Sequence, residues 1–522
     1  MTAASQPADD ARHGRIRPTE VALLASVFVV AACGLVYELA AGALASYLLG
    51  DSVLQFSTVI GAYLFAMGIG SYLSRFFEHQ LVAHFLRIEL LVGLVGGLMP
   101  AALFALFNVA AGSFRFALYA LVLLVGTLVG LEIPLVMRIL KRHFSARYAL
   151  KDLVSQVLTF DYLGALAVSV AFPLLLVPQL GLIRTGAFFG LLNVGVAVWA
   201  LWLFRAELRR LRAHSLACAL SVAALCGAFA GADAVTTWAE ERFYAESVLY
   251  SENSAYQRVV VTSGKAGVRL FLNGNLQFHS RDEYRYHEAL VHPAMAAHGG
   301  PKQVLVLGGG DGMAVREVLK HPQVEQVTLV ELDPHMTRLF ADQPLLRRLN
   351  ADALHSPKLK IVNADAFGWL EHNPALQFDV IIVDFTDPTN IAVGKLYTTS
   401  FYRLIDHHLA AGGYATVQTT SPLIARKSFW TVAQTIEAAG LGTTPYHAHV
   451  PSFGEWGFIV ASRRPYALPR QLPPGLRFIS LDGLPALFQF PPDMARVPAD
   501  VNRLSNQVLV RTYEQEWGKV HW

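Results

Sequence analysis

The sequence has little charge and little cysteine. Only 16% of its 522 residues are charged, whereas soluble globular proteins average about 25%, which excludes an ordinary soluble protein for the chain as a whole. The formal net charge is +3, and the more polar half has no basic stripe with interleaved aromatic residues, so no nucleic-acid partner is expected. The three cysteines have no CxxC or Cys/His spacing, so neither a disulfide framework nor a zinc site is expected.

Long apolar runs fill the N-terminal half instead. A helix needs about 20 apolar residues to cross a bilayer, and seven stretches reach that length. They are 21–43, 53–74, 86–108, 116–138, 155–178, 182–204 and 214–234, of which the last is the least hydrophobic. We therefore expect a polytopic α-helical membrane bundle of about seven helices, in contact with the lipid bilayer of the cell membrane.

Basic residues near the ends of these stretches predict their orientation. Most of them fall on one side, which should be cytoplasmic and include the N-terminus. They are Arg12, Arg15, Arg17, Arg75, Arg87, Lys141, Arg142, Arg147, Lys151, Arg205, Arg209, Arg210 and Arg212, whereas only Arg115 and Arg184 fall on the other side. Seven crossings would then place the C-terminal half outside the cell.

Three carboxylates, Glu38, Glu132 and Asp161, lie inside these stretches or at their edges. An ionised acid at mid-membrane costs at least about 2.5–3.5 kcal/mol, so such residues usually face a bundle interior or an aqueous path. Two interpretations stay open. Either the three acids hold a cation, or they join helices by hydrogen bonds or by pairing with Arg138 or Arg184.

The C-terminal half has strands and helices of ordinary polarity. Strands predicted at 257–262, 268–272 and 276–278 indicate a small antiparallel sheet, because Asn273-Gly274 between two of them is a strong hairpin signal. Further strands alternate with helical stretches, which is typical of a parallel sheet with helices on both faces. They are expected at 303–307, 327–331, 359–363, 379–383, 414–418, 446–450 and 456–461.

The predicted architecture is thus a membrane bundle followed by a small β-domain and an α/β Rossmann-like domain. The expected parts are residues 1–235 for the bundle, 236–298 for the small β-rich part, 299–470 for the Rossmann-like domain and 471–522 for a C-terminal tail that packs on it.

Acidic residues stand at or just beyond the ends of four predicted strands, where parallel sheets bind their ligands. The first strand ends in a turn with Gly308, Gly310 and Gly312 that also carries an acid, Asp311. The second ends at Glu331, nineteen positions after Gly312, where an acid can accept both ribose hydroxyls. Asp365 follows the third strand, and Asp384 and Asp387 lie at the end of the fourth. An acid in the glycine turn predicts an enzyme acting on an amine-bearing nucleoside.

The order of these motifs resembles polyamine aminopropyltransferases of the spermidine synthase family, over about residues 245 to 465. The motifs are Asn273-Gly274, Gln277, Arg281-Asp282-Glu283, Tyr286-His287-Glu288, Gly308 to Gly312, Glu331-Leu332-Asp333 and Asp384-x-Thr386-Asp387-Pro388. The apolar half, with Leu396-Tyr397, Gln418 to Pro422 and Pro451 to Phe458, resembles the membrane-fused branch of that family.

The resemblance implies a class I methyltransferase-like fold, no metal and no prosthetic group. The co-substrate would be decarboxylated S-adenosylmethionine, and the acceptor putrescine or a related amine. The residues implied in donor binding are Gln257, Gly308, Gly310, Asp311, Gly312, Glu331, Asp365 and Ala366. Those implied in amine binding are Gln277, Tyr286, His287, Asp311 and Asp387. Asp384 would accept the proton of the attacking ammonium, and Asp311 would repel the carboxylate of ordinary S-adenosylmethionine.

The sequence departs from the family pattern around the acceptor. Phe453 stands where soluble members commonly have a tyrosine, Phe385 where Ser or Cys is usual, and the loop after Pro388 adds Lys395. Two other functions stay open: a methyltransferase on the same sheet, and a polyamine transporter or sensor with a non-catalytic nucleoside-binding domain. Self-association through the small β-domain is also open.

The predicted topology conflicts with this function, because the donor would normally be found in the cytoplasm. Either the weak seventh stretch does not cross the bilayer, or the enzyme faces outward.

Overall fold

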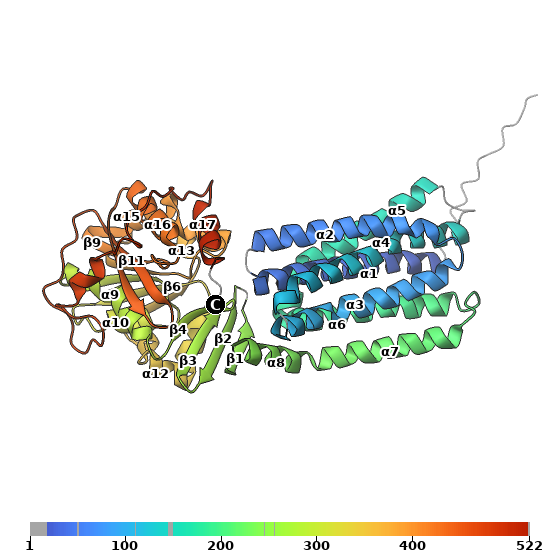
Figure 1. Ribbon diagram of the computed structural model, residues 1–522, viewed down its shortest axis with the longest axis horizontal. Helices are drawn as coiled ribbons and strands as arrows, with labels where there is room; N and C mark the ends of the chain where they lie inside the picture. Colours follow the sequence, from blue (N-terminus) through green and yellow to red (C-terminus); the bar gives the residue numbers. More distant parts are fainter. Residues whose placement is uncertain are drawn as a thin grey trace, which may run out of the picture. The chain divides into compact units, whose positions relative to one another are not determined.

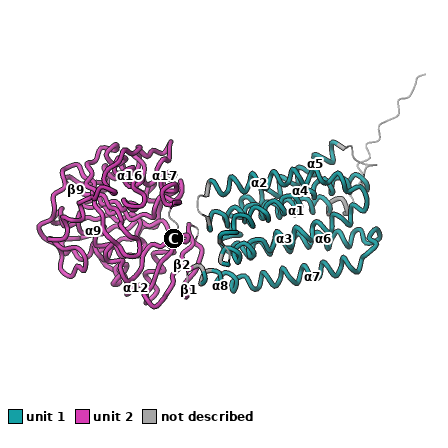
Figure 2. Tube along the Cα trace, in the orientation of Figure 1, with its two compact units in different colours: residues 1–243 teal, residues 244–522 magenta. Residues whose placement is uncertain are grey.

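The computed structural model describes residues 18–49, 52–109, 111–144, 150–244, 246–254 and 256–519. The chain divides into two compact units, residues 1–243 and 244–522, which we call the helical unit and the α/β unit (Figure 2). Four arginines used for the predicted orientation lie outside the described residues: Arg12, Arg15, Arg17 and Arg147.

The helical unit is a bundle of long helices around α1 (Figure 1). Its helices are α1 (Pro18–Leu49), α2 (Ser52–Leu73), α3 (Leu81–Val109), α4 (Phe114–Phe144), α5 (Leu150–Ala171), α6 (Val177–Leu203), α7 (Leu211–Ala230) and α8 (Ala232–Tyr244), with single turns η1 (Ser74–Phe76), η2 (Ala111–Ser113) and η3 (Phe172–Leu176). Helix α1 packs against each of α2 to α6. Small residues let neighbours approach closely, as where a Cβ on Gly130 of α4 would lie 2.2 Å from the Met67 carbonyl oxygen of α2.

Six stretches of the described residues are long and apolar enough to cross a membrane. One of them, Lys151–Leu203, has 53 residues, which is about 80 Å of helix and more than twice the thickness of a bilayer core. Within it the backbone of Gly181 is non-helical, at φ 72 and ψ 172. The stretch therefore contains two helical segments, at the place where two were predicted. Several long apolar helices are confirmed, and the number that cross a bilayer stays a prediction.

The α/β unit begins with a four-stranded antiparallel sheet in the order β1-β2-β3-β4. Its strands are β1 (Ser247–Asn253), β2 (Arg258–Gly264), β3 (Gly267–Leu272) and β4 (Asn275–His279). Asn273 and Gly274 both have positive φ, 50° and 81°, as the tight hairpin turn predicted for this pair requires. Strand β1 was not predicted, because its mixture of polar and apolar residues leaves it only partly buried.

The large sheet has the order β10-β11-β9-β8-β5-β6-β7. Its strands are β5 (Gln303–Gly308), β6 (Gln326–Glu331), β7 (Leu359–Asn363), β8 (Phe378–Asp384), β9 (Leu409–Gln418), β10 (Gly442–Val450) and β11 (Gly454–Ser462). Strands β5 to β9 are parallel and the last two are antiparallel. The predicted Rossmann-like architecture is confirmed. The strand order reverses between β5 and β8, so ligands should bind beyond the carboxyl ends of these two strands.

Helices cover both faces of this sheet. They are α9 (Glu283–His298), α10 (Met313–Val318), α11 (Pro334–Asp342), α12 (Pro344–Leu349), α13 (Ala366–His372), α14 (Ile391–Gly394), α15 (Thr399–His408), α16 (Arg426–Ala438) and α17 (Val508–Trp517), with η4 (Ala353–His355), η5 (Lys395–Tyr397) and η6 (Leu484–Phe488). Val304 and Val306 of β5 belong to one buried cluster, with α9 and α10, whereas Leu305 and Leu307 belong to the other, with α15 and α16. Both faces are apolar because successive side chains of a strand point to opposite sides.

The segment after β11 packs on α16. The Glu516 carboxylate of α17 accepts hydrogen bonds from the backbone N–H groups of Lys427 and Ser428, at 2.8 and 2.9 Å, in the first turn of α16. The indole N–H of Trp430 donates to the Met494 carbonyl oxygen at 3.1 Å. These bonds hold the C-terminal helix close to the ends of strands β8 and β9, where it reaches the site described next.

Candidate active site

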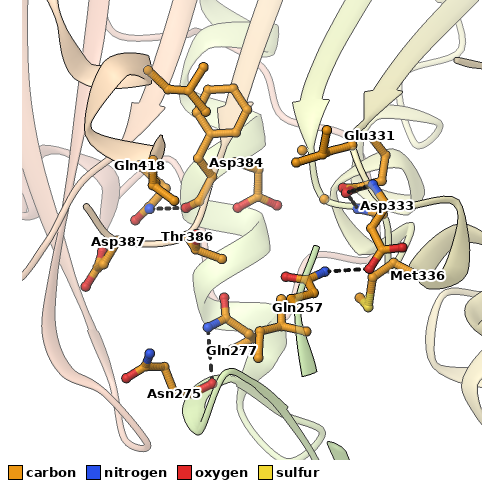
Figure 3. Close-up of a pocket in the computed structure, with 18 of the residues that line it drawn as sticks. Gln257, Asn275, Gln277, Glu331, Asp333, Met336, Asp384, Thr386, Asp387 and Gln418 are labelled. Atoms are coloured by element: carbon orange, nitrogen blue, oxygen red, sulfur yellow. Dashed lines mark hydrogen bonds between the residues drawn. The ribbon is translucent and has the colours of Figure 1, made fainter. Parts of the chain in front are cut away.

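A cavity of about 470 Å³ lies at the carboxyl ends of the parallel strands (Figure 3). The small sheet, the turns after β5, β6 and β8, the loop before α15, and α17 all contribute to its walls. Twelve of the predicted site residues line it: Gln257, Gln277, Tyr286, His287, Gly308, Gly310, Asp311, Glu331, Asp365, Ala366, Asp384 and Asp387. The chain therefore brings these residues together from elements far apart in sequence.

The glycine turn after β5 has the shape that the sequence predicted. Gly308 pairs with Asp384 of the neighbouring β8, and a Cβ on Gly308 would lie 2.2 Å from the Asp384 carbonyl oxygen. Gly312 is the exception among the predicted binding residues, because it does not line the cavity. It has a φ of 78°, begins α10, and a Cβ there would meet the Leu354 side chain at 2.8 Å. Its observed contribution is to the geometry of the turn, and a contact with the donor stays a prediction.

Glu331 and Gln257 lie on one side of the cavity and are linked by Asp333 (Figure 3). The Glu331 carboxylate accepts from the backbone N–H groups of Gly310 at 3.0 Å and of Asp333 at 2.9 Å. Burial raises the pKa of Glu331 to about 7, although these two hydrogen bonds lower it. The Gln257 side chain donates to the Asp333 carboxylate at 3.1 Å. This arrangement holds an acceptor oxygen where a vicinal diol can bind.

Asp365 caps helix α13 and forms an ion pair with Lys395, which also lines the cavity. One carboxylate oxygen accepts from the Gly368 N–H at 3.0 Å, and the other lies 2.8 Å from the Lys395 ammonium. Lys395 is the additional lysine of the loop after Pro388. A ligand amino group that binds Asp365 must therefore share its carboxylate with Lys395.

Asp311 is buried at the end of the glycine turn. Its carboxylate accepts from the Met313 N–H at 2.9 Å, and its carbonyl oxygen accepts from the Asn350 amide at 2.9 Å. Burial raises the pKa of Asp311, while the charge of His287 and the bond from Met313 oppose that shift. The backbone around this acid is therefore fixed on both sides.

His287 is a buried cation. Its Nδ1 lies 2.8 Å from the Glu283 carboxylate and 2.8 Å from the Glu283 carbonyl oxygen, and Arg316 pairs with the same carboxylate at 2.8 Å. Burial lowers the pKa of His287, but the hydrogen bond and charge of Glu283, with the charges of Asp311 and Asp384, outweigh it and raise the pKa to about 9. The imidazole is therefore protonated at neutral pH and is not available to accept a proton.

Asp384 is the carboxylate at the switch point of the sheet. Its Oδ1 accepts from the Tyr286 hydroxyl at 2.6 Å. Burial raises the pKa of Asp384 to about 6, and the charge of His287 and the bond from Tyr286 work against that shift. Gly309 leaves room beside the second oxygen, since a Cβ there would lie 2.9 Å from Oδ2. Asp384 is thus ionised at neutral pH, and one of its oxygens has space for a ligand.

Asp387 is held by the C-terminal helix. The Tyr513 hydroxyl of α17 donates to its Oδ2 at 2.8 Å. Burial raises the pKa of Asp387 to about 6, and the bonds from Tyr513 and Gln418 lower it. Gln418 is itself fixed, because it donates to the Tyr397 hydroxyl at 3.1 Å and accepts from the Trp456 indole at 3.1 Å.

Two residues that the sequence analysis did not assign to the site, Gln418 and Tyr513, also line the cavity. Gln418 ends strand β9, so its place at a strand end was a usable signal. Tyr513 had none, because it lies in a tail without a motif, 126 residues after the Asp387 that it contacts. Within the described residues, no group of three His, Cys, Asp or Glu side chains is arranged to hold a metal ion.

Four carboxylates, one of them buried and three partly buried, thus line a cavity whose lining includes one buried cation. They are Asp311, Glu331, Asp384 and Asp387, and the cation is His287. Such a cavity favours ligands that bring positive charge. The fold and this site define a nucleoside-dependent transferase that acts on amines.

Comparisons with known proteins give the family. The model of the spermine/spermidine synthase domain matches residues 283–469. Polyamine aminopropyltransferase 2 of Ralstonia nicotianae is 55% identical over 95% of this chain and 98% of its own, and the polyamine aminopropyltransferase of Leptospira interrogans is 49% identical over 96% of this chain and 99% of its own. A spermidine synthase solved with the transition-state analogue AdoDATO is 30% identical over 47% of this chain and 85% of its own, with a TM-score of 0.43.

The chain belongs to the polyamine aminopropyltransferase family. The similarity to these relatives extends through the helical unit as well as the α/β unit, because nearly the whole chain is matched. The predicted resemblance is confirmed, and so is the prediction of an aminopropyltransferase over a methyltransferase or a non-catalytic sensor.

Proposed function

We propose that this protein is a membrane-anchored enzyme that moves the aminopropyl group of decarboxylated S-adenosylmethionine to putrescine or a related amine. The products would be spermidine or a similar polyamine, and methylthioadenosine. The observation that carries the proposal is the set of buried and partly buried carboxylates around one cavity, since donor and acceptor both bring ammonium groups and the donor adds a sulfonium.

The donor would bind along the ends of β5, β6 and β7. Glu331 would accept from the ribose hydroxyls, with Gln257 and Asp333 supporting the same side of the cavity. Asp365 and Ala366 would contact the adenine, with Lys395 moving off the carboxylate or sharing it. Asp311 would attract the aminopropyl ammonium and repel the carboxylate of ordinary S-adenosylmethionine, so that the choice of donor comes from repulsion as well as attraction.

The acceptor would lie between Asp384 and Asp387. Asp387 would bind the distal ammonium, and Gln277 and Tyr286 would line its path. Asp384 would accept a proton from the attacking ammonium, because an amine is a nucleophile only when neutral. His287, protonated at neutral pH, would attract the neighbouring carboxylates of Asp311 and Asp384. It would not compete with Asp384 for the proton.

The chemical step needs alignment and one base. The neutral nitrogen attacks the methylene carbon attached to the sulfonium, a C–N bond forms, and the C–S bond breaks with its electron pair going to sulfur. Asp384 takes up one proton of the acceptor ammonium before this attack, and the product nitrogen keeps its other two protons as a secondary ammonium. Since the sulfonium is already an activated leaving group, most of the acceleration would come from orientation.

The helical unit would anchor the enzyme in the cell membrane. Six stretches of the described residues have the length and apolar character of membrane spans, and exposed large apolar side chains are frequent on the outer helices. In water such a surface would be unfavourable, so a bilayer is its natural surrounding.

The function can be tested on the full chain purified in detergent. We expect methylthioadenosine to be released from decarboxylated S-adenosylmethionine when putrescine or another diamine is supplied. Butylamine is the matched control, because it lacks only the second ammonium that Asp387 would bind, and it should react poorly. Failure of every diamine and polyamine to support release would refute the proposal.

A further inference from the structure

Among the described residues of the helical unit, two carboxylates are fully buried and have no role in the proposed function. Glu89 of α3 is 0% exposed and Glu132 of α4 is 1% exposed. Glu132 was singled out in the sequence, whereas Glu89 was not. Their sequence neighbours Ile88, Leu90 and Leu131 belong to a buried apolar cluster of the unit, where an acid without partners is costly.

Three of the four oxygen atoms of this pair have no hydrogen-bond partner. Both carboxylate oxygens of Glu132 and Oε1 of Glu89 are unpartnered, and only Oε2 of Glu89 is satisfied, by the Asn193 amide at 2.9 Å. The arginines proposed as partners are engaged elsewhere: Arg138 donates to the Ser74 carbonyl oxygen and Arg184 pairs with Asp233. Among the described residues, no lysine or arginine forms an ion pair with either acid.

Two tyrosines lie near the pair, and their hydroxyl groups already donate hydrogen bonds to other groups. Tyr37 and Tyr63 are fully buried. The Tyr37 hydroxyl donates to the Asn193 side-chain oxygen at 3.4 Å and the Tyr63 hydroxyl to the Gly34 carbonyl oxygen at 2.8 Å. Glu132 is close enough to interact electrostatically with Glu89 and with both tyrosines. The cluster therefore joins five helices, α1, α2, α3, α4 and α6, and both of its tyrosine hydroxyls already donate to groups other than the two acids.

We propose that Glu89 and Glu132 form a binding site for an alkylammonium ion of the kind that the enzyme uses as acceptor or makes as product. An ammonium brings three donors and a positive charge to the three free oxygens. Neighbouring aromatic rings favour organic ammonium ions through cation–π attraction, and the buried side chains of this part of the unit are apolar, as a methylene chain prefers. The choice of amine rests on the proposed function, whereas the site itself lies in the other unit of the chain.

The test is equilibrium binding of radiolabelled spermidine to the full chain in detergent. Replacing both acids, Glu89→Gln and Glu132→Gln, keeps their shape and removes their charge. We expect the double variant to lose one bound amine per chain relative to the wild type, with transferase activity unchanged. Glu78→Gln, at an exposed acid of the same unit, is the matched control and should keep the wild-type stoichiometry. Equal stoichiometry in the wild type and the double variant would overturn the proposal.

A second measurement uses the wild type, so that a folding defect in the variants cannot obscure the answer. A hydrophobic carbodiimide modifies buried carboxyl groups, and mass spectrometry locates the labelled peptides. Spermidine should protect Glu89 and Glu132 from labelling. Absence of protection would overturn the proposal, and equal protection by sodium or potassium would replace the alkylammonium by an inorganic cation. If methylthioadenosine release fails while protection persists, the proposed function is wrong and the site remains.

Discussion

At the scale of residues, the surroundings of two neighbouring groups, Asp384 and His287, give them different pKa values. Asp384 and His287 interact electrostatically, yet the pKa of Asp384 is about 6 and that of His287 about 9. Burial alone would make both groups neutral. The Glu283 carboxylate is what keeps the imidazole charged, and the imidazolium in turn favours the ionised form of Asp384. One site thus holds a base and a fixed cation at the same pH.

This separation predicts the pH dependence of kcat/KM. Activity should rise as pH passes about 6, because Asp384 loses its proton, and fall as pH passes about 9, because His287 loses its charge. In His287→Asn the decline near pH 9 should disappear, and the rise should move to a pH above 6, because the charge of His287 no longer lowers the pKa of Asp384. Ionisation of the amine substrate is common to both enzymes and cancels in their ratio. A ratio that does not change between pH 7 and 10 would remove His287 from this role.

Asp311→Asn tests how the donor is chosen. Removing the charge should raise the preference for S-adenosylmethionine relative to its decarboxylated form by about 10–100-fold, as expected for a like-charge contact of a few kcal/mol. The measurement is competitive binding of the two nucleosides. Asp365→Asn is the control, because losing a contact to adenine should weaken the binding of both nucleosides equally. An equal loss for both in Asp311→Asn would mean that the acid only shapes the glycine turn.

Most of these residues could be predicted because acids at strand ends stand out against apolar strands. The sequence could not predict how the acids are held. Tyr286 was expected to contact the amine, and its hydroxyl also donates a hydrogen bond to Asp384. Gly312 was expected to contact the donor, and the structure places it at the N-cap of α10, outside the cavity lining. These differences depend on side-chain packing, which spacing along the chain does not encode.

At the scale of elements, the C-terminal helix α17 completes the acceptor end of the cavity. Its Tyr513 holds Asp387, whereas Phe453, which also lines the cavity, has no hydroxyl to offer. Helix α17 is positioned by Glu516, which binds the first turn of α16. The strands of the large sheet could be predicted from their apolar runs. The reach of α17 into the site could not, because α17 follows a long segment in which only η6 is helical.

Tyr513→Phe should therefore weaken acceptor binding. The Tyr513 bond lowers the pKa of Asp387, so its loss leaves more of this acid protonated near neutral pH. We expect the KM for putrescine to rise roughly fivefold at pH 7, as for a hydrogen bond of about 1 kcal/mol, and to approach the wild-type value at pH 9. Tyr466→Phe, which removes a hydroxyl bonded to the Pro293 carbonyl oxygen, is the control. An equal rise in the donor KM would contradict a specific role at the acceptor.

At the scale of the whole molecule, two units of different character share one chain. The apolar stretches and the α/β pattern could both be predicted, because composition changes sharply between them. The break at Gly181 lies between two of the predicted stretches, whereas the buried Glu89 could not be predicted, since one acid in an apolar run has many explanations.

The anchoring predicts that the protein and its transferase activity stay in the membrane pellet after an alkaline carbonate wash and leave it only with detergent. Release by carbonate would contradict integral insertion. Intact cells that make the protein distinguish the two predicted topologies. Protease added from outside digests the α/β unit if all seven predicted stretches cross the membrane, and spares it if the seventh does not.

The central claim is that Asp384 is the base that activates the acceptor, and Asp384→Asn tests it most directly. The amide keeps the shape of the side chain and cannot take the proton. In the full chain, kcat for methylthioadenosine release should fall by about 10²–10⁴-fold, the usual effect of losing a general base, while the affinity for decarboxylated S-adenosylmethionine changes little. Turnover that stays at the wild-type level in this variant would contradict the account.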